Sequence, residues 1–293
     1  MIKLRRFGGN PILQPNPHNQ WESNCVFNPA AIYHDELFHM LYRAMGVDNI
    51  SRVGYAVSRD GFHFYRLDKP VFSPELISEP RGCEDPRVVY LDGEFYMTYT
   101  AYSDDGTRIG LASTRNFITW DRYSIEWPEV NNKDAVLFPE KIDNKYVLYH
   151  RPMDQDQMGI WIAYSEDLIH WHGQKEIMKP EYEWEYKKIG ASPPPLKTEI
   201  GWVLFYHGVD KDAMYQVGVA LFDLKSPDKL IGRYPYSIFK PEKRYELQGF
   251  IPKVVFPCGA VEYDGNYYIY YGGADKVIGA AIADKQEILN LFR

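Results

Sequence analysis

The feature that most constrains the fold of this chain is a short hydrophobic segment that recurs five times. Each copy follows a polar turn such as Asp92-Gly93, and each precedes a second segment of small and apolar residues, such as Gly54 to Val57. The five copies end at Tyr42, Tyr99, His150, Tyr206 and Tyr271. Asp-Gly pairs supply the positive φ of tight hairpins, so each repeat reads as paired strands. A spacing of roughly 50 to 65 residues is typical of folds that repeat one supersecondary unit.

Five units of about four short strands each predict an all-β chain folded as a five-bladed β-propeller. Aromatic residues make up 16% of the chain, which also favours strands, and no long segment has helical periodicity. A β-sandwich would contain hairpins too, but it would not need five similar copies. No linker interrupts residues 1–293, so we expect one domain, with residues 1–25 as an irregular N-terminal arm.

The net charge of −7 excludes a general nucleic-acid-binding protein, because phosphate backbones need clustered Lys and Arg. The start of the chain lacks the apolar run of a secretory signal, and no window is long and apolar enough to span a membrane. The three cysteines, Cys25, Cys83 and Cys258, are scattered and form no C-x-x-C pair. We therefore expect a cytoplasmic protein with no membrane partner, no nucleic-acid partner and no metal site.

The most informative local motif is Glu84-Asp85-Pro86-Arg87, which precedes the apolar residues Val88 to Tyr90. Proline fixes the backbone and would hold the Asp85 carboxyl rigidly at the start of a strand. A carboxyl held in this way suits a general acid that protonates a glycosidic oxygen. The alternative is a surface turn in which Asp85 caps a backbone amide, and the pattern alone leaves both interpretations open.

Cations recur at the ends of the predicted strands. Arg43, Arg151 and His207 end second strands, and Lys133 begins a first strand. Cations that converge on one pocket of an acidic protein indicate an anionic ligand, and the planar fork of Arg suits phosphate. Each of them could instead form an ordinary ion pair. Asp275 follows a glycine pair and would either bind sugar hydroxyls or finish a turn.

These motifs resemble glycoside hydrolase family 130, the mannoside phosphorylases and related β-mannosidases, and the resemblance runs nearly end to end. It rests on Asn10-Pro11-Ile12-Leu13, Phe27-Asn28-Pro29-Ala30, Tyr42-Arg43-Ala44, Gly82-Cys83-Glu84-Asp85-Pro86-Arg87, Lys133-Asp134-Ala135, Tyr206-His207-Gly208 and Gly272-Gly273-Ala274-Asp275. The resemblance implies a five-bladed propeller. It also implies that Asp85 is the general acid, passing its proton to the bridging oxygen through a hydroxyl of the mannosyl unit.

The resemblance also implies the residues that bind the ligands. The mannoside would be held by Asn28, Arg43, Glu84, Lys133, Tyr206 and Asp275. Phosphate would be held by Arg151 and His207, with Lys133 and Tyr206 as further candidates. Lys133 thus has two open roles. No cofactor is expected apart from inorganic phosphate as co-substrate, and homo-oligomers are common among such enzymes.

Phosphorolysis and hydrolysis make different demands on the site. An inverting hydrolase needs a second carboxylate that activates water, and Glu140 and Asp134 are the candidates for it. An inverting phosphorylase needs the acid and a set of cations that hold phosphate in line for attack. Because basic residues occupy the ends of two strands, at Arg151 and His207, we expect a phosphorylase that converts a β-1,2- or β-1,4-mannoside and phosphate to α-mannose 1-phosphate. A β-1,2-mannosidase of the same family is the alternative.

Two other classes of propeller fit less well. A sugar-binding lectin would repeat the same binding residues in every unit, whereas the residues at the five strand ends differ. A furanosidase with this fold would need carboxylates in three separate blades. A single asymmetric catalytic site is therefore the expectation.

Overall fold

The computed structural model describes residues 2–123, 125, 131–153 and 158–293, and the fold of this part is all-β, as predicted. The helical elements described are short: α1 (Arg244–Leu247), α2 (Lys285–Leu289) and the 3-10 turns η1 (Gln20–Glu22), η2 (Glu183–Glu185) and η3 (Asn290–Phe292). No helix in these ranges has the length and apolar character needed to cross a membrane.

The described strands form four sheets, which divide into five antiparallel groups in chain order. The first group holds β2 (Cys25–His34), β3 (Leu37–Met45), β4 (Ser51–Ser58) and β5 (Tyr65–Arg66), and the second holds β6 (Gly82–Leu91), β7 (Glu94–Ser103), β8 (Gly106–Thr114) and β9 (Asp121–Tyr123). These two groups count as one sheet because a single parallel pair, Ser51 with Gly82, joins β4 to β6.

The other three groups are separate sheets. The third holds β10 (Asn132–Leu137), β11 (Tyr146–Pro152), β12 (Ile160–Ser165) and β13 (His172–Met178). The fourth holds β14 (Lys188–Ala191), β15 (Leu196–Lys197), β16 (Trp202–Val209), β17 (Tyr215–Phe222) and β18 (Leu230–Arg233). The fifth holds β19 (Val255–Tyr263), β20 (Asn266–Gly273), β21 (Val277–Asp284) and β1 (Arg5–Arg6), which pairs with β21.

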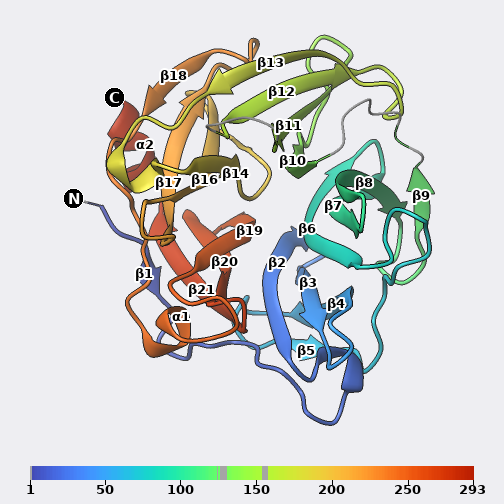
Figure 1. The fold of residues 1–293 in the computed structure, drawn as a ribbon. Helices are drawn as coiled ribbons and strands as arrows, with labels where there is room; N and C mark the ends of the chain where they lie inside the picture. Colours follow the sequence, from blue (N-terminus) through green and yellow to red (C-terminus); the bar gives the residue numbers. More distant parts are fainter. Residues whose placement is uncertain (1, 124, 126–130, 154–157) are drawn as a thin grey trace.

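The five groups surround a common centre, and the first strand of each group, namely β2, β6, β10, β14 and β19, lies nearest to it (Figure 1). Because β1 joins β21, residues from both ends of the described chain share the fifth sheet. The region expected to be irregular, residues 1–25, contributes β1, η1 and the first residue of β2.

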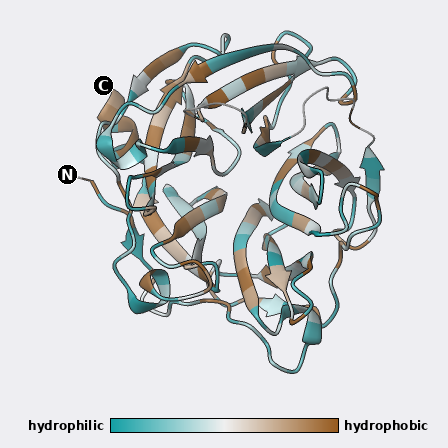
Figure 2. Cartoon of the chain, viewed as in Figure 1, coloured by the Kyte–Doolittle hydropathy of each residue, from teal (hydrophilic) through white to brown (hydrophobic). Residues whose placement is uncertain are grey.

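Hydrophobic residues are frequent along the strands (Figure 2), and their buried side chains form clusters that join neighbouring groups. One buried cluster joins Phe205 of β16 to Ile269 of β20, and another joins Tyr149 of β11 to Leu204 of β16. Aromatic rings contribute heavily to these contacts, as in the edge-to-face packing of Phe138 on Trp202 at 5.0 Å. The aromatic residues of the repeats therefore serve mainly to pack sheet on sheet.

The first strands are irregular at corresponding places. Register shifts interrupt the pairing of β2, β6, β10 and β19 with their neighbours. Three of these bulges contain a residue in the left-handed region, namely Asn28 (φ 46°), Asp85 (φ 49°) and Asp134 (φ 55°). A bulge turns a side chain away from the regular alternation of a strand. Asp85 thus lies inside β6, at its bulge, and not at the start of the strand as the Pro86 argument had it.

Candidate active site

A cavity of about 220 Å³ is lined by the three bulge residues and by further side chains, so that all five groups contribute to its wall. Its walls are Asn28, Arg43, Asp85, Lys133, Asp134, Arg151, Lys188, Tyr215, Ile251, Val254, Phe256 and Asp275. Seven residues singled out from the sequence are therefore neighbours in space: Asn28, Arg43, Asp85, Lys133, Asp134, Arg151 and Asp275.

The Asp85 carboxyl is held by two side chains from the first strand group. Its Oδ1 accepts hydrogen bonds from Asn28 Nδ2 at 2.8 Å and from Arg43 Nη1 at 3.0 Å. The second Arg43 nitrogen, Nη2, donates to Glu84 Oε1 at 2.6 Å. Arg43 thus bridges the two adjacent acids, and Glu84 supports the site from behind Arg43 without lining the cavity.

The two carboxyls on this side of the cavity have opposite pKa shifts. Burial raises the pKa of Asp85, but the charges of Arg43, Arg87 and Lys133 outweigh burial and bring it below its ordinary value. Burial, together with the negative charges of Asp85 and Glu84, raises the pKa of Asp275 to about 7 despite the opposing charge of Arg43. Near neutral pH the site thus contains an ionised Asp85 and a partly protonated Asp275.

Asp134 organises the opposite side of the cavity. Its Oδ1 accepts from Arg87 Nη2 at 3.1 Å, and its Oδ2 accepts from Arg151 Nε at 2.8 Å and lies 2.6 Å from Arg151 Nη2. Burial raises the pKa of Asp134, but the charges of Arg151 and Arg87 outweigh burial and bring the pKa below its ordinary value. A carboxylate shared by two buried guanidinium groups is fixed in place and ionised, so Asp134 acts as an anchor for Arg151.

His207 lies beneath this side of the cavity and is fully buried. Its Nδ1 is 3.1 Å from Ser192 Oγ, and its Nε2 is 3.5 Å from Asp134 Oδ2. Burial lowers the pKa of His207 to about 3, with the nearby Asp134 opposing this effect. The sequence argument treated His207 as a cation, and this was wrong: the ring is neutral at physiological pH.

Two lysines bring positive charge without a paired acid. Within the described part of the chain, neither Lys133 nor Lys188 forms an ion pair with a carboxylate, and both line the cavity. Burial, with the charges of Arg151 and Lys133, lowers the pKa of Lys188 to about 8. Its Nζ lies 5.1 Å from the centre of the Tyr215 ring.

Sequence reasoning missed Lys188 and Tyr215. Lys188 lies two residues before the predicted strand start at Gly190, and Tyr215 begins a third strand that carries no charged motif. The signal that could have found Lys188 is its position in the fourth unit, because first-strand starts supplied Asn28, Asp85 and Lys133 in the others.

Two other candidates lie away from the cavity. Tyr206 is fully buried in the packing between sheets, where its hydroxyl donates to Glu185 Oε1 at 2.7 Å. Glu140 is on the surface and forms an ion pair with Lys197 at 2.6 Å. Tyr206 therefore cannot touch a ligand in this cavity, and Glu140 is not in reach as a base.

The ranges that the structure describes contain no group of three His, Cys, Asp or Glu side chains arranged to hold a metal ion. The three cysteines are buried as free thiols.

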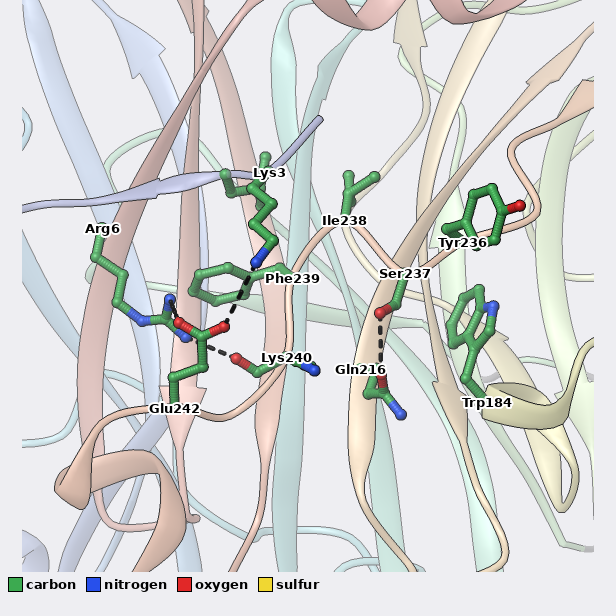
Figure 3. A pocket seen from close by; sticks show the side chains of 11 residues that line it. Lys3, Arg6, Trp184, Gln216, Tyr236, Ser237, Ile238, Phe239, Lys240 and Glu242 are labelled. Atoms are coloured by element: carbon green, nitrogen blue, oxygen red, sulfur yellow. Dashed lines mark hydrogen bonds and ion pairs between the residues drawn. The ribbon is translucent and has the colours of Figure 1, made fainter. Parts of the chain in front are cut away.

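A second cavity, of about 240 Å³, lies between the β1 region and the fourth group (Figure 3). Trp184 and Tyr236 lie at one end of it and Arg6 and Glu242 at the other. The Arg6 guanidinium is already committed, because it donates to Glu242 and Glu246 and to the Lys240 carbonyl. This cavity offers no free charged cluster comparable to the first one.

Comparison with known proteins identifies close relatives. The profile of a family described as "beta-1,4-mannooligosaccharide phosphorylase" matches residues 3–293. A "1,2-beta-oligomannan phosphorylase" from Thermoanaerobacter sp. (strain X514) is 48% identical, with 98% of this chain and 99% of that protein covered. A "Beta-1,2-mannobiose phosphorylase" from the same strain is 45% identical, with 98% and 99% covered. Among solved structures, the "Beta-1,2-Mannobiose phosphorylase from Listeria innocua" in complex with β-1,2-mannobiose superposes with a TM-score of 0.90 at 27% identity, covering 99% of each chain.

Proposed function

Since this chain belongs to glycoside hydrolase family 130, we propose that it is an inverting phosphorylase that cleaves β-mannosides with inorganic phosphate. The products are α-mannose 1-phosphate and an acceptor shortened by one mannose. The cavity around Asp85 is the active site, and phosphate is the only co-substrate.

One observation carries the proposal. Four cations, namely Arg43, Lys133, Arg151 and Lys188, face three carboxyls in this cavity, and one of these carboxyls, that of Asp275, has its pKa raised to about 7. The two lysines are not neutralised by an acid within the described residues. A buried excess of positive charge needs an anion, and phosphate is an anion of the right size for a site of about 220 Å³.

Bond making and breaking balance in one displacement. A phosphate oxygen attacks the anomeric carbon from the face opposite the glycosidic oxygen, and the bond from that carbon to the glycosidic oxygen breaks. The departing oxygen receives the proton of the Asp85 carboxyl, relayed through a hydroxyl of the mannosyl unit. Because attack and departure occur on opposite faces, a β-mannoside gives the α-phosphate.

Bound phosphate also accounts for the proton that Asp85 needs as a general acid. In the empty site the neighbouring cations favour ionised Asp85, whereas a general acid must carry a proton. Bound phosphate brings negative charge among Lys133, Arg151 and Lys188, and this offsets the cations that depress the pKa of Asp85. The acid thus becomes protonated when the nucleophile is in place.

The sugar is held on the side of the first, second and fifth strand groups. Asn28, Arg43 and Asp275 supply donors and acceptors for mannosyl hydroxyls, and Glu84 fixes Arg43. Ile251, Val254 and Phe256 form an apolar wall, which suits the hydrophobic face of a pyranose ring. Lys133 lies between the two sides and contacts both ligands.

A β-1,2 linkage is the preferred substrate in this proposal. The relatives at 48% and 45% identity are named for β-1,2-linked substrates, whereas a relative named for β-1,4-mannooligosaccharides is 33% identical.

The hydrolase alternative needs a base for water. Asp134 is engaged by Arg87 and Arg151, and Glu140 is paired with Lys197 outside the cavity. Asp275 is the remaining carboxyl, and a pKa of about 7 would suit a base. The product distinguishes the two enzymes, since a phosphorylase forms mannose 1-phosphate and a hydrolase releases free mannose.

The architecture that supports this site is proposed to be a five-bladed propeller in a single domain. Five antiparallel groups follow one another along the chain around a common centre, and each contributes at least one residue to the cavity (Figure 1). The edge of the fifth group is covered by β1, as ring closure requires.

The decisive experiment incubates the protein with β-1,2-mannobiose, and separately with β-1,4-mannobiose, with and without phosphate. We expect mannose 1-phosphate to form only when phosphate is present, and faster from the β-1,2 substrate. Release of free mannose at the same rate without phosphate would overturn the phosphorylase assignment in favour of the mannosidase.

A further inference from the structure

A cluster of buried Glu, Tyr and Arg side chains recurs in four of the five strand groups, as far as the structure describes them. In each cluster a Glu precedes the first strand, a Tyr lies in the second strand, and an Arg belongs to the outermost strand. The clusters are Glu22 with Tyr42 and Arg66, Glu79 with Tyr99 and Arg122, Glu185 with Tyr206 and Arg233, and Glu246 with Tyr271 and Arg6. In all four, the Glu is fully buried.

The opposing strand is adapted to these tyrosines. Each Tyr pairs with a glycine in the third strand, and a Cβ on that glycine would lie within 2.6 Å of the tyrosine ring. In the third group the corresponding pair is His150 with Trp161. The cluster is thus a recurrent structural feature of the fold, whereas the residue that follows each Tyr differs from one strand group to the next.

The cluster of the fourth strand group, Glu185 with Tyr206 and Arg233, connects two segments of the chain. The Tyr206 hydroxyl donates to Glu185 Oε1 at 2.7 Å and accepts from Arg233 Nε at 3.0 Å. The other oxygen of Glu185 accepts from two backbone amides of its own segment, at 3.0 and 3.1 Å. The hydroxyl therefore fixes η2 against β16.

Both segments lead directly to the phosphate side of the cavity. Lys188 is three residues after Glu185, and His207 is the residue after Tyr206. The strands meet where Gly190 pairs with His207, and a Cβ at Gly190 would lie 2.5 Å from that ring. The His207 Nε2 atom has no hydrogen-bond partner among the described residues. The strand register, the Ser192 contact and packing on Phe256 at 4.5 Å therefore place the ring.

We propose that Tyr206 is a positioning residue for phosphate: by tying Glu185 of η2 to β16, it sets the register of β14 and β16 and so the place of Lys188 in the cavity wall. This inference rests on the proposed phosphorylase function. Tyr206 touches no ligand, and its effect passes through Lys188 and His207.

Removal of the hydroxyl has a specific consequence. In Tyr206→Phe, Glu185 Oε1 and Arg233 Nε lose a partner in a buried environment, where unpaired polar groups are costly. Glu185 and Arg233 keep their direct ion pair, but the hydrogen bond from Tyr206 that ties η2 to β16 is lost, and η2 moves relative to β16. Lys188 and His207 shift relative to each other, while Asn28, Arg43 and Asp85 on β2, β3 and β6 keep their contacts with one another.

The second group offers a matched control. Tyr99 makes the same contact with Glu79, at 2.5 Å, and faces Gly110 in the same way. The residue after it, Thr100, pairs with Glu84 and lies outside the cavity lining. Tyr99→Phe therefore causes a similar loss of stability without a link to the phosphate side.

The test measures the KM for phosphate, the KM for β-1,2-mannobiose, kcat and the melting temperature for wild type, Tyr206→Phe and Tyr99→Phe. We expect Tyr206→Phe to raise the KM for phosphate by about tenfold and to change the KM for the sugar by less than about twofold. Tyr99→Phe should lower the melting temperature similarly while its KM for phosphate stays within about twofold of wild type.

Equal KM values for phosphate in the two variants, or an equal rise in both KM values for Tyr206→Phe, would show that the cluster is only structural. Such a result would leave the phosphorylase activity of the wild type standing, so the two proposals fail separately. Titration of inorganic phosphate into each folded protein by calorimetry gives the same comparison without turnover, and a weaker affinity confined to Tyr206→Phe supports the positioning role.

Discussion

The two sides of the active-site cavity are built on opposite principles. On the sugar side, acids outnumber cations: Glu84 and Asp85 share Arg43, and Asp275 has its pKa raised to about 7. On the side proposed for phosphate, Asp134 pairs with Arg87 and Arg151, while Lys188 has no carboxylate partner among the described residues. In the proposed function, this difference separates a place for proton transfer from a place for an anion within one cavity.

The largest expected effect tests the sugar side. Asp85→Asn removes the proton donor but keeps the size of the side chain, so kcat/KM should fall by at least about 1000-fold with the fold intact. Steady-state kinetics and circular dichroism check this. Asp104→Asn, on an exposed carboxylate paired with Arg81, is the control. Activity of Asp85→Asn within about tenfold of wild type would exclude Asp85 as the acid.

A smaller effect is expected on the phosphate side. Arg151→Ala should raise the KM for phosphate by about 100-fold, far more than the KM for mannobiose, because a desolvated charge pair with phosphate is lost. Arg151→Lys, which keeps the charge beside Asp134, should recover part of the loss. Arg115→Ala, on an exposed arginine paired with Glu94, is the control. If both KM values rise together, the division of the cavity into two sides is wrong.

Asp275 links the sugar side to stability. Its folded pKa is about 7, above the ordinary value of 3.8, so the folded state keeps a proton that the unfolded state has released. Between about pH 4 and pH 7 the unfolded state binds fewer protons, and this residue costs increasing stability as pH rises. From pH 4 to pH 8, the free energy of unfolding of Asp275→Asn should therefore rise by about 2 kcal/mol relative to that of wild type. Urea unfolding at both pH values measures this, and a constant difference would contradict the raised pKa.

The smallest expected effect is the pH dependence of phosphate binding. Lys188 has its pKa lowered to about 8, so it loses its charge as pH rises through this value, and the KM for phosphate should rise by about tenfold between pH 7.5 and pH 9.5. Kinetics at several pH values check the rise. In Lys188→Arg the KM should stay flat, because Arg remains charged. Lys187→Arg, at the exposed neighbouring residue, should behave as wild type.

The sequence predicted the repeat and much of the cavity because both depend on local patterns. The polar turns before the hydrophobic segments recur at regular spacing, and the polar residues at the predicted strand starts led to Asp85 and Lys133, while the family resemblance added Asn28. Sequence spacing could not predict the ionised state of Asp85, since it depends on Arg43, a residue of the preceding group.

Tyr206 shows where local reasoning fails. It is adjacent to His207 at a strand end, and both were assigned to the ligands. Neighbouring side chains in a strand point to opposite faces of the sheet, so only one of the two can face the cavity floor. The charge of His207 was likewise mispredicted, because burial outweighs the effect of Asp134 on its pKa.

The pairing of β1 with β21 has a consequence for how the molecule is made. Arg6 is translated 240 residues before its ion-pair partner Glu246, and its sheet partner Ala281 follows later still. The fifth sheet therefore cannot be completed during translation until β21 has emerged. Contacts so distant in sequence form slowly, and the segment around β1 has to wait, without its sheet partner, while the residues between them are synthesised.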